Sequence, residues 1–207
     1  MHRVWMTFAC FWVVCAPSAQ AQPATDALDW EFRQENYIRI VPHDNSLWTP
    51  VLWADHGLLH LEARFNYEDV DLASVFGGLH LVGGSDVTYD VHLMAGLSFG
   101  WTTGLVPAYR FEIDWWQLDL CSEGEVFLDL STEDNDFVYS WSELGWSPLD
   151  HLRGGIALQN TRLYQVSRDV EVGPFLGTDM WLIDATFYVF SLGTDETNYT
   201  IIVGISF

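Results

Sequence analysis

From Leu58 to the end of the chain, apolar and polar residues alternate in segments of roughly ten, separated by short stretches rich in glycine, aspartate, asparagine and serine. Alternation with a period of two is typical of strands with two unlike faces, and the intervening residues favour turns. The pattern predicts an all-β chain with ten strands, and eight or twelve stay open because strand boundaries are uncertain by a few residues. The predicted strands cover residues 58–67, 72–82, 87–101, 106–121, 125–131, 137–146, 152–164, 169–177, 180–191 and 197–207.

The alternation is clearest in 58–67, 91–101 and 180–191, where odd-numbered positions are apolar and most even-numbered positions are polar or small. In 106–121 the phase changes after Trp116, which a bulge or bend in a single long strand would produce. Each strand thus has one apolar face. That face meets either a second sheet, as in a soluble β-sandwich, or lipid, as around a barrel.

The last nine residues alternate in the same way and end on an aromatic side chain. The apolar or aromatic positions are Tyr199, Ile201, Val203, Ile205 and Phe207. This arrangement resembles the C-terminal targeting strand of bacterial outer-membrane β-barrels. The resemblance implies a transmembrane antiparallel up-and-down β-barrel in the Gram-negative outer membrane. It also implies contact with outer-membrane lipid and lipopolysaccharide, with the barrel-assembly machinery and with periplasmic chaperones.

The N-terminus has the features of a secretory signal peptide. Arg3 supplies a positive charge, Val4–Cys15 is apolar, and Ala19-Gln20-Ala21 is a small-x-small cleavage site, so residues 1–21 are predicted to be removed after export. The apolar stretch is too short to span a bilayer as a helix. The mature chain would keep one cysteine, Cys121, so an internal disulfide is excluded.

Residues 22–56 differ from the rest of the mature chain because they contain three prolines and no sustained alternation. We interpret them as a periplasmic lead-in or plug-like segment, with possible short strands at 37–41 and 50–54. Residues 57–207 then form the outer-membrane barrel.

Composition supports a barrel in lipid. The chain is 49% hydrophobic and 15% aromatic, yet its formal net charge is -21, and apolar and acidic residues are interleaved rather than segregated. A transmembrane barrel needs this mixture, because each strand gives one face to lipid and one to a polar lumen. The negative charge disfavours nucleic acid as a partner. A secreted soluble β-sandwich that binds a partner stays open as an alternative.

Aromatic residues near the predicted strand ends suggest the girdles that mark the two membrane interfaces. These residues are Tyr67, Trp101, Tyr109, Trp146, Tyr164 and Tyr199. With both chain ends in the periplasm, the turns at 83–86, 122–124, 147–151 and 178–179 would face the periplasm. The connections at 68–71, 102–105, 132–136, 165–168 and 192–196 would face outside. All are short, which disfavours adhesion, receptor or protease functions carried by long loops.

The polar faces of the strands would line the lumen as a network of ionisable side chains. Buried charges persist when they are paired or hydrated, so we expect mainly structural ion pairs, with a restricted pore or small-ligand site as the alternative. The network comprises His60, Glu62, Arg64, His80, Asp90, His92, Arg110, Glu112, Asp114, Asp129, Arg153 and Asp184. Arg162 is expected to face the same lumen.

The histidines on three successive predicted strands raise the question of a metal. His60, His80 and His92, together with Glu62 and Asp90, supply ligand types that divalent metals accept. The spacing does not place them at one height in the barrel, so ordinary lumen histidines are favoured. We therefore predict no metal site and no cofactor.

An enzyme on a barrel scaffold is the other alternative. Some outer-membrane barrels of this size act on lipids with a histidine, a serine and a carboxylate near the rim, and Ser98, Ser140 and Ser142 are available here with His92. No G-x-S-x-G, H-E-x-x-H or P-loop motif marks them, so no catalytic residue is predicted. The favoured function is non-enzymatic: an envelope structural protein or a narrow solute channel. The sequence does not indicate the oligomeric state.

Overall fold

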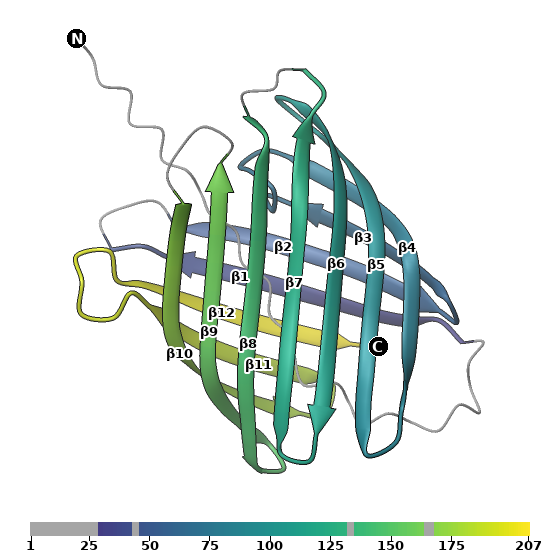
Figure 1. Cartoon of the computed structure of the whole chain (residues 1–207), viewed down its shortest axis with the longest axis vertical. Helices are drawn as coiled ribbons and strands as arrows, with labels where there is room; N and C mark the ends of the chain where they lie inside the picture. Colours follow the sequence, from purple (N-terminus) through teal and green to yellow (C-terminus); the bar gives the residue numbers. More distant parts are fainter. Residues whose placement is uncertain (1–28, 43–45, 132–134, 164–167) are drawn as a thin grey trace.

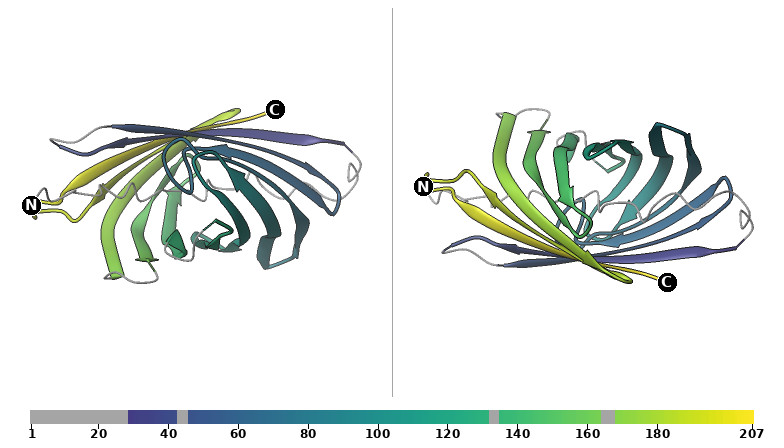
Figure 2. Two further views of the ribbon diagram at one scale, coloured as in Figure 1. Left: turned by 90° about the horizontal axis from the view of Figure 1, so that it is seen from above. Right: turned by 90° about the horizontal axis from the view of Figure 1, so that it is seen from below.

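A computed structural model describes residues 29–42, 46–131, 135–163 and 168–207, which form one closed antiparallel barrel (Figure 1). Each strand pairs with its neighbours along the chain, and the last strand pairs with the first. The views from above and below in Figure 2 show the strands surrounding one interior. The strands are β1 (Glu31–Ile40), β2 (Leu47–His56), β3 (Leu59–Phe65), β4 (Ala73–Gly84), β5 (Val87–Phe99), β6 (Thr103–Trp115), β7 (Leu118–Asp129), β8 (Phe137–Leu149), β9 (Leu152–Leu163), β10 (Arg168–Met180), β11 (Ile183–Phe190) and β12 (Asn198–Ser206).

The barrel has twelve strands, so the favoured number of ten is corrected to the upper alternative. Strands β3–β12 match the ten predicted from residue 58 onward, and the two additional strands are β1 and β2. Both belong to the barrel wall, so residues 31–40 and 47–56 are not a lead-in or a plug. The predicted signal peptide, 1–21, lies outside the described residues.

Two turns differ from those predicted, and both contain a tryptophan with positive φ. The segment 106–121 is divided into β6 and β7 by a turn at Trp116, whose φ is 59°, and residues 122–124 lie inside β7 instead of forming a turn. The turn expected at 178–179 lies at Trp181, whose φ is 60°. Non-glycine residues rarely adopt this conformation, and tryptophan is not a typical turn former. Locating turns by glycine, aspartate, asparagine and serine therefore missed these two positions.

The two faces of the wall are sharply different. On β3, His60, Glu62 and Arg64 are buried inside, whereas Leu59 and Leu61 are exposed on the outside. Because the sheet closes on itself, no second sheet covers its apolar face, and this excludes the soluble β-sandwich. Such an exterior is that of a membrane-spanning barrel. Among the described residues, no helix is long and apolar enough to cross a membrane.

The two ends of the barrel also differ. At one end, five connections of two residues each join β2 to β3, β4 to β5, β6 to β7, β8 to β9 and β10 to β11; we call this the short-turn end. Longer connections lie at the opposite, long-loop end. Short turns face the periplasm in bacterial barrels, so the short-turn end is the one we expect there.

Exposed tryptophans mark both ends. Trp116 and Trp181, at the short-turn end, are 85% and 97% exposed, and Trp101 is exposed at the long-loop end. The expected place of Tyr67 among these interfacial aromatics is wrong, because its side chain is only 2% exposed. Asn66, with a φ of 56°, changes the phase of the chain after β3 and turns Tyr67 into the interior. Tyr164 lies outside the described residues.

A substitution on the outer face tests which medium surrounds it. Leu93 lies in the middle of β5 with its side chain outward. We expect Leu93→Arg to destabilise the barrel refolded in phospholipid vesicles by about 2–4 kcal/mol, the cost of an arginine near the bilayer midplane. Denaturant unfolding in vesicles measures this change. The matched control is Leu58→Arg, in a two-residue turn, where the same arginine should cost about 0–1 kcal/mol. Equal effects at both positions would contradict a lipid-facing surface.

Candidate functional site in the barrel lumen

The predicted polar residues occupy inward positions of seven strands. Most are buried, and His80, Asp90, Glu112 and Asp114 are half-buried near the short-turn end. Arg162 is an exception, since its side chain is exposed. The structure adds further interior charges that the sequence analysis did not single out: Arg33, Glu35, Arg39, Asp55, Glu68, Asp119, Glu123, Glu125, Glu143 and Glu171. Glu35 and Asp55 were missed with β1 and β2, and Glu123 was assigned to a turn.

Two buried arginines tie β3, β6 and β7 together across the lumen. Arg64 donates to Glu62 on its own strand and, at 2.8 Å, to Glu125 on β7. Arg110 on β6 donates from Nε to Glu123 at 3.3 Å, and one of its terminal nitrogens lies 4.0 Å from Glu62. Each charge is therefore held by carboxylates from more than one strand, as buried charges require.

Aromatic rings flank these guanidinium groups. The guanidinium carbon of Arg64 lies 4.1 Å from the ring centroids of both Tyr67 and Phe76, and that of Arg110 lies 4.3 Å from the centroid of Trp53. Cation–π contacts of this kind are strengthened where water is excluded. The arginines are consequently packed as well as paired.

A second network is centred on Arg153 of β9. Its guanidinium donates to Asp119 of β7 and, at 2.6 Å, to Glu143 of β8. Glu143 also accepts hydrogen bonds from the indole of Trp141 at 2.8 Å and from the hydroxyl of Tyr188 at 2.9 Å. Four strands, β7, β8, β9 and β11, thus converge on one arginine–carboxylate centre.

A third network lies where the ends of the chain meet. Arg33 of β1 donates to Glu35 at 2.8 Å, to Asp184 of β11 at 2.7 Å and to Ser206 of β12 at 2.9 Å. Gly204 makes room for this bridge, because a Cβ at that position would overlap both Arg33 and Asp184. The network joins the strands on either side of the closure between β1 and β12.

Apolar side chains fill much of the remaining interior. One cluster includes Trp141, whose indole packs against Tyr188 and Phe190 at centroid distances of 5.4 Å and 5.2 Å. A second cluster includes Phe76 and Phe127. The lumen is therefore occupied by paired charges and aromatic rings rather than being a wide open bore.

The connection between β3 and β4 folds inward and adds a further carboxyl group. Glu68 lies in this connection, outside the strands, and accepts a hydrogen bond from Ser74, whose hydroxyl oxygen also lies 2.9 Å from the hydroxyl oxygen of Ser98. Burial raises the pKa of the Glu68 carboxyl above its usual range, since desolvation disfavours its charged form. Glu68 thus caps the arginine network from the long-loop side, 3.7 Å from Arg64.

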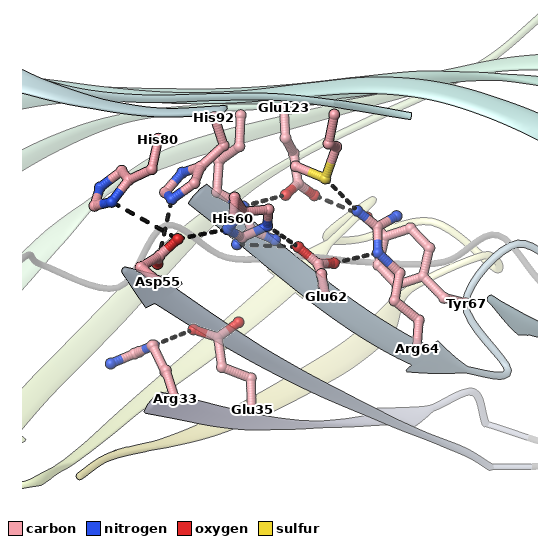
Figure 3. Close-up of polar contacts among 12 residues, drawn as sticks. Arg33, Glu35, Asp55, His60, Glu62, Arg64, Tyr67, His80, His92 and Glu123 are labelled. Atoms are coloured by element: carbon pink, nitrogen blue, oxygen red, sulfur yellow. Dashed lines mark hydrogen bonds and ion pairs between the residues drawn. The ribbon is translucent and has the colours of Figure 1, made fainter. Parts of the chain in front are cut away.

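The three lumen histidines do converge, around a carboxylate that the sequence analysis had not used. Asp55 of β2 lies 2.7 Å from His60, 3.7 Å from His80 and 3.5 Å from His92 (Figure 3). The rings of His80 and His92 stack, with centroids 4.4 Å apart. The pairing of β4 with β5 places these two histidines directly opposite each other, which fixes their common height.

The serines considered for catalysis do not join this histidine group. Ser98 contacts Ser74, Ser142 lies 3.0 Å from Ser122, and Ser140 accepts from Asn160 at 3.3 Å. In the part of the chain that the structure describes, no hydrogen bond links any of these three serines to a histidine. The described residues therefore do not pair Ser98, Ser140 or Ser142 with a histidine in the manner of a catalytic triad.

Comparison with known proteins identifies the fold. No protein-family model matches the chain, and no curated protein matches it in sequence. Among solved structures, the KdgM porin in complex with disordered oligogalacturonate matches with a TM-score of 0.59 at 12% identity, covering 84% of this chain and 99% of the porin. A second KdgM porin structure matches with a TM-score of 0.55 at 11% identity and the same coverage. The chain has a porin-like fold, a closed antiparallel β-barrel.

The lumen of this porin-like barrel is strongly acidic. Eleven carboxylate side chains but only three arginines are buried among the described residues, and the half-buried Arg33 and Arg39 do not balance the difference. The buried carboxylates are Glu35, Asp55, Glu62, Glu68, Asp119, Glu123, Glu125, Asp129, Glu143, Glu171 and Asp184. Acidic linings of this kind favour cations over anions.

Proposed function

We propose that the protein is a narrow outer-membrane channel that prefers cations and small neutral solutes to anions. The observation that carries this proposal is the excess of carboxylates over arginines in the lumen. Carboxylate rings attract cations and repel anions across a low-dielectric wall. The ion pairs and aromatic clusters restrict the bore, so the conductance of a single barrel should be small.

The acidic lumen favours solutes different from the one found with a porin of similar fold. One of them was solved with disordered oligogalacturonate, which is an acidic oligosaccharide. A polyanion of that kind would meet an acidic lumen here, so we expect this chain not to pass it. The shared fold accommodates different solutes because selectivity depends on the residues that line the lumen.

Reversal potentials in planar bilayers test the proposal. We expect the refolded mature chain to produce small discrete steps, and a potassium chloride gradient across the bilayer to give a reversal potential shifted toward that of potassium. A shift toward chloride would overturn the cation preference. A folded, inserted barrel without steps would overturn the channel and leave an envelope structural protein.

Two carboxylates at the long-loop end offer a matched comparison. Asp129 accepts a hydrogen bond from Thr102 at 2.8 Å, and Glu171 accepts one from Asn198 at 2.7 Å. The double variant Asp129→Asn, Glu171→Gln should reduce the potassium preference while retaining the shape of both side chains. Asp150→Asn, in an exposed turn outside the lumen, is the control and should leave the reversal potential unchanged.

A further inference from the structure

The geometry points to a binding site for a divalent transition metal inside the short-turn end of the barrel, with His80, His92 and Asp90 as ligands and Asp55 as the carboxylate that supports them. This assigns a metal to a group of histidines that the sequence alone favours as ordinary lumen residues. The inference is independent of the proposed channel, because it depends on these four side chains and not on passage of a solute.

The first observation is that polar atoms face one another here without forming hydrogen bonds. His80 Nε2 lies 3.1 Å from Asp90 Oδ1, and both atoms are buried, yet neither makes a hydrogen bond. On the other side of the second ring, His92 Nε2 is also buried without a hydrogen bond, 3.5 Å from Asp55. Buried polar groups are normally satisfied, so a cluster of such atoms within one small volume indicates a missing partner. A cation bound between His80 Nε2 and Asp90 Oδ1 would be a partner for both of these atoms.

The spacing of the three ligand atoms suits a small metal ion. Zinc–nitrogen and zinc–oxygen bonds of about 2.0–2.2 Å in a tetrahedral site place neighbouring ligand atoms about 3.3 Å apart. Asp90 Oδ1 lies 3.1 Å from His80 Nε2 and 3.5 Å from His92 Nδ1, close to that separation on both sides. The two imidazole rings are nearly parallel, with an interplanar angle of 5°, so they would tilt toward a shared ion as it binds.

Asp55 occupies the position of an outer carboxylate. It lies 3.7 Å from His80 Nδ1 and 3.5 Å from His92 Nε2, the ring nitrogens opposite those directed at Asp90. Metal-binding histidines usually donate their second N–H to a carboxylate, which orients the ring and raises its basicity as a ligand. A single carboxylate serving both histidines fits that arrangement.

His60 belongs to the support of the site rather than to its ligands. Its Nδ1 lies 2.7 Å from Asp55 and its Nε2 lies 3.2 Å from Glu62, so both ring nitrogens already have hydrogen-bond partners. A metal bound by Asp55, His60 and His92 would have to break the shorter of these contacts. The site at His80, Asp90 and His92 requires no such loss.

The surroundings provide both charge and access. Glu112 of β6 lies opposite Asp90 in the pairing of β5 and β6, which places a second carboxylate beside the ligands. Arg110 lies opposite His92 in the same pairing, but its guanidinium contacts Glu123 and Glu62. Asp90 retains about a third of its side-chain exposure, whereas His92 is buried, so an ion can enter from the short-turn end and reach the histidines. Imidazole and carboxylate ligands together suit zinc and its neighbours in the first transition row.

Zinc titration of the refolded barrel tests the site. By calorimetry in detergent, we expect saturable binding of one zinc per chain at micromolar concentration or below. His80→Ala and Asp90→Asn should each weaken binding at least tenfold. Asp55→Asn, which removes no ligand, should weaken it by about 10–100-fold, the effect of losing an outer carboxylate. Cobalt provides a second readout, because His80→Ala should remove the visible absorption bands of the bound ion.

The controls separate this site from other histidines. His151 also faces a carboxylate, Asp179 at 3.1 Å, but it is exposed on a turn, so His151→Ala should leave zinc binding unchanged. His60→Gln should keep the one-to-one stoichiometry. Circular dichroism and the migration of unheated samples on gels show that each variant is folded, and His80→Gln replaces His80→Ala if the latter fails to fold. The inference is overturned if the folded wild-type barrel binds no zinc at micromolar concentration, or if His151→Ala weakens binding as much as His80→Ala.

Discussion

Replacing Arg153 by leucine is expected to destabilise the barrel by about 3–5 kcal/mol, because it removes one partner of a buried ion pair and leaves the other uncompensated. Arg153 donates to both Asp119 and Glu143, and all three side chains are almost fully buried. Without the guanidinium, two carboxylates would share a low-dielectric interior. Urea unfolding of the refolded protein, followed by tryptophan fluorescence, measures the change in the free energy of unfolding.

Arg162→Leu is the matched control, since Arg162 lies on the same strand, β9, but its side chain is exposed. Its effect should stay within about 0.5 kcal/mol, as for most surface substitutions. Adding Glu143→Gln to Arg153→Leu should recover part of the lost stability by removing one of the two unpaired charges. If Arg153→Leu and Arg162→Leu have equal effects, the Arg153 network does not stabilise the fold.

Replacing Trp141 by alanine should raise the single-channel conductance several-fold. Trp141 is 0% exposed and fills the lumen against Tyr188 and Phe190. Its removal leaves a space beside the polar Glu143, where water can enter because the site offers hydrogen-bond partners. The same change should cost about 3–5 kcal/mol of stability, as large-to-small aromatic substitutions in packed interiors do. Planar-bilayer recording at fixed salt measures the conductance.

Trp146→Ala provides the comparison on the same strand, because Trp146 is 54% exposed on the outer face of β8. Its loss removes an outward side chain without opening the interior, so conductance should not change. A folded Trp141→Ala barrel with unaltered conductance would show that this aromatic cluster does not limit passage.

The wall of the barrel was predictable where its outer face is uniformly apolar, and it was missed where that face is mixed. Strands β3–β12 follow the period-two pattern. In β1 the outward positions include Gln34 and Asn36, and in β2 they include Pro50, whereas Val51 faces the lumen. The alternation in these strands is therefore weak in sequence, and their place in the wall depends on hydrogen bonding to β12 and β3, which no local pattern reveals.

The chemistry of the lumen was only partly predictable, for a different reason. The alternation of positions along each strand identifies which side chains point inward, and it placed His60, His80 and His92 in the interior. Their mutual distances depend on strand register, which the turns fix. The turn at Trp116 was not recognised, so the positions of Asp119 and Glu123 relative to Arg153 and Arg110 could not be derived.

The junction between the first and last strands has a consequence for biogenesis. Eight residue pairs join β1 to β12, from Arg33 opposite Ser206 to Ile40 opposite Tyr199. Until β12 is present, the growing sheet has two free margins whose peptide groups find no partner in hydrocarbon, where each unsatisfied group costs several kcal/mol. A prematurely terminated chain therefore cannot seal itself. Only copies that include β12 should therefore insert stably into the bilayer, so membrane insertion itself selects against truncated chains.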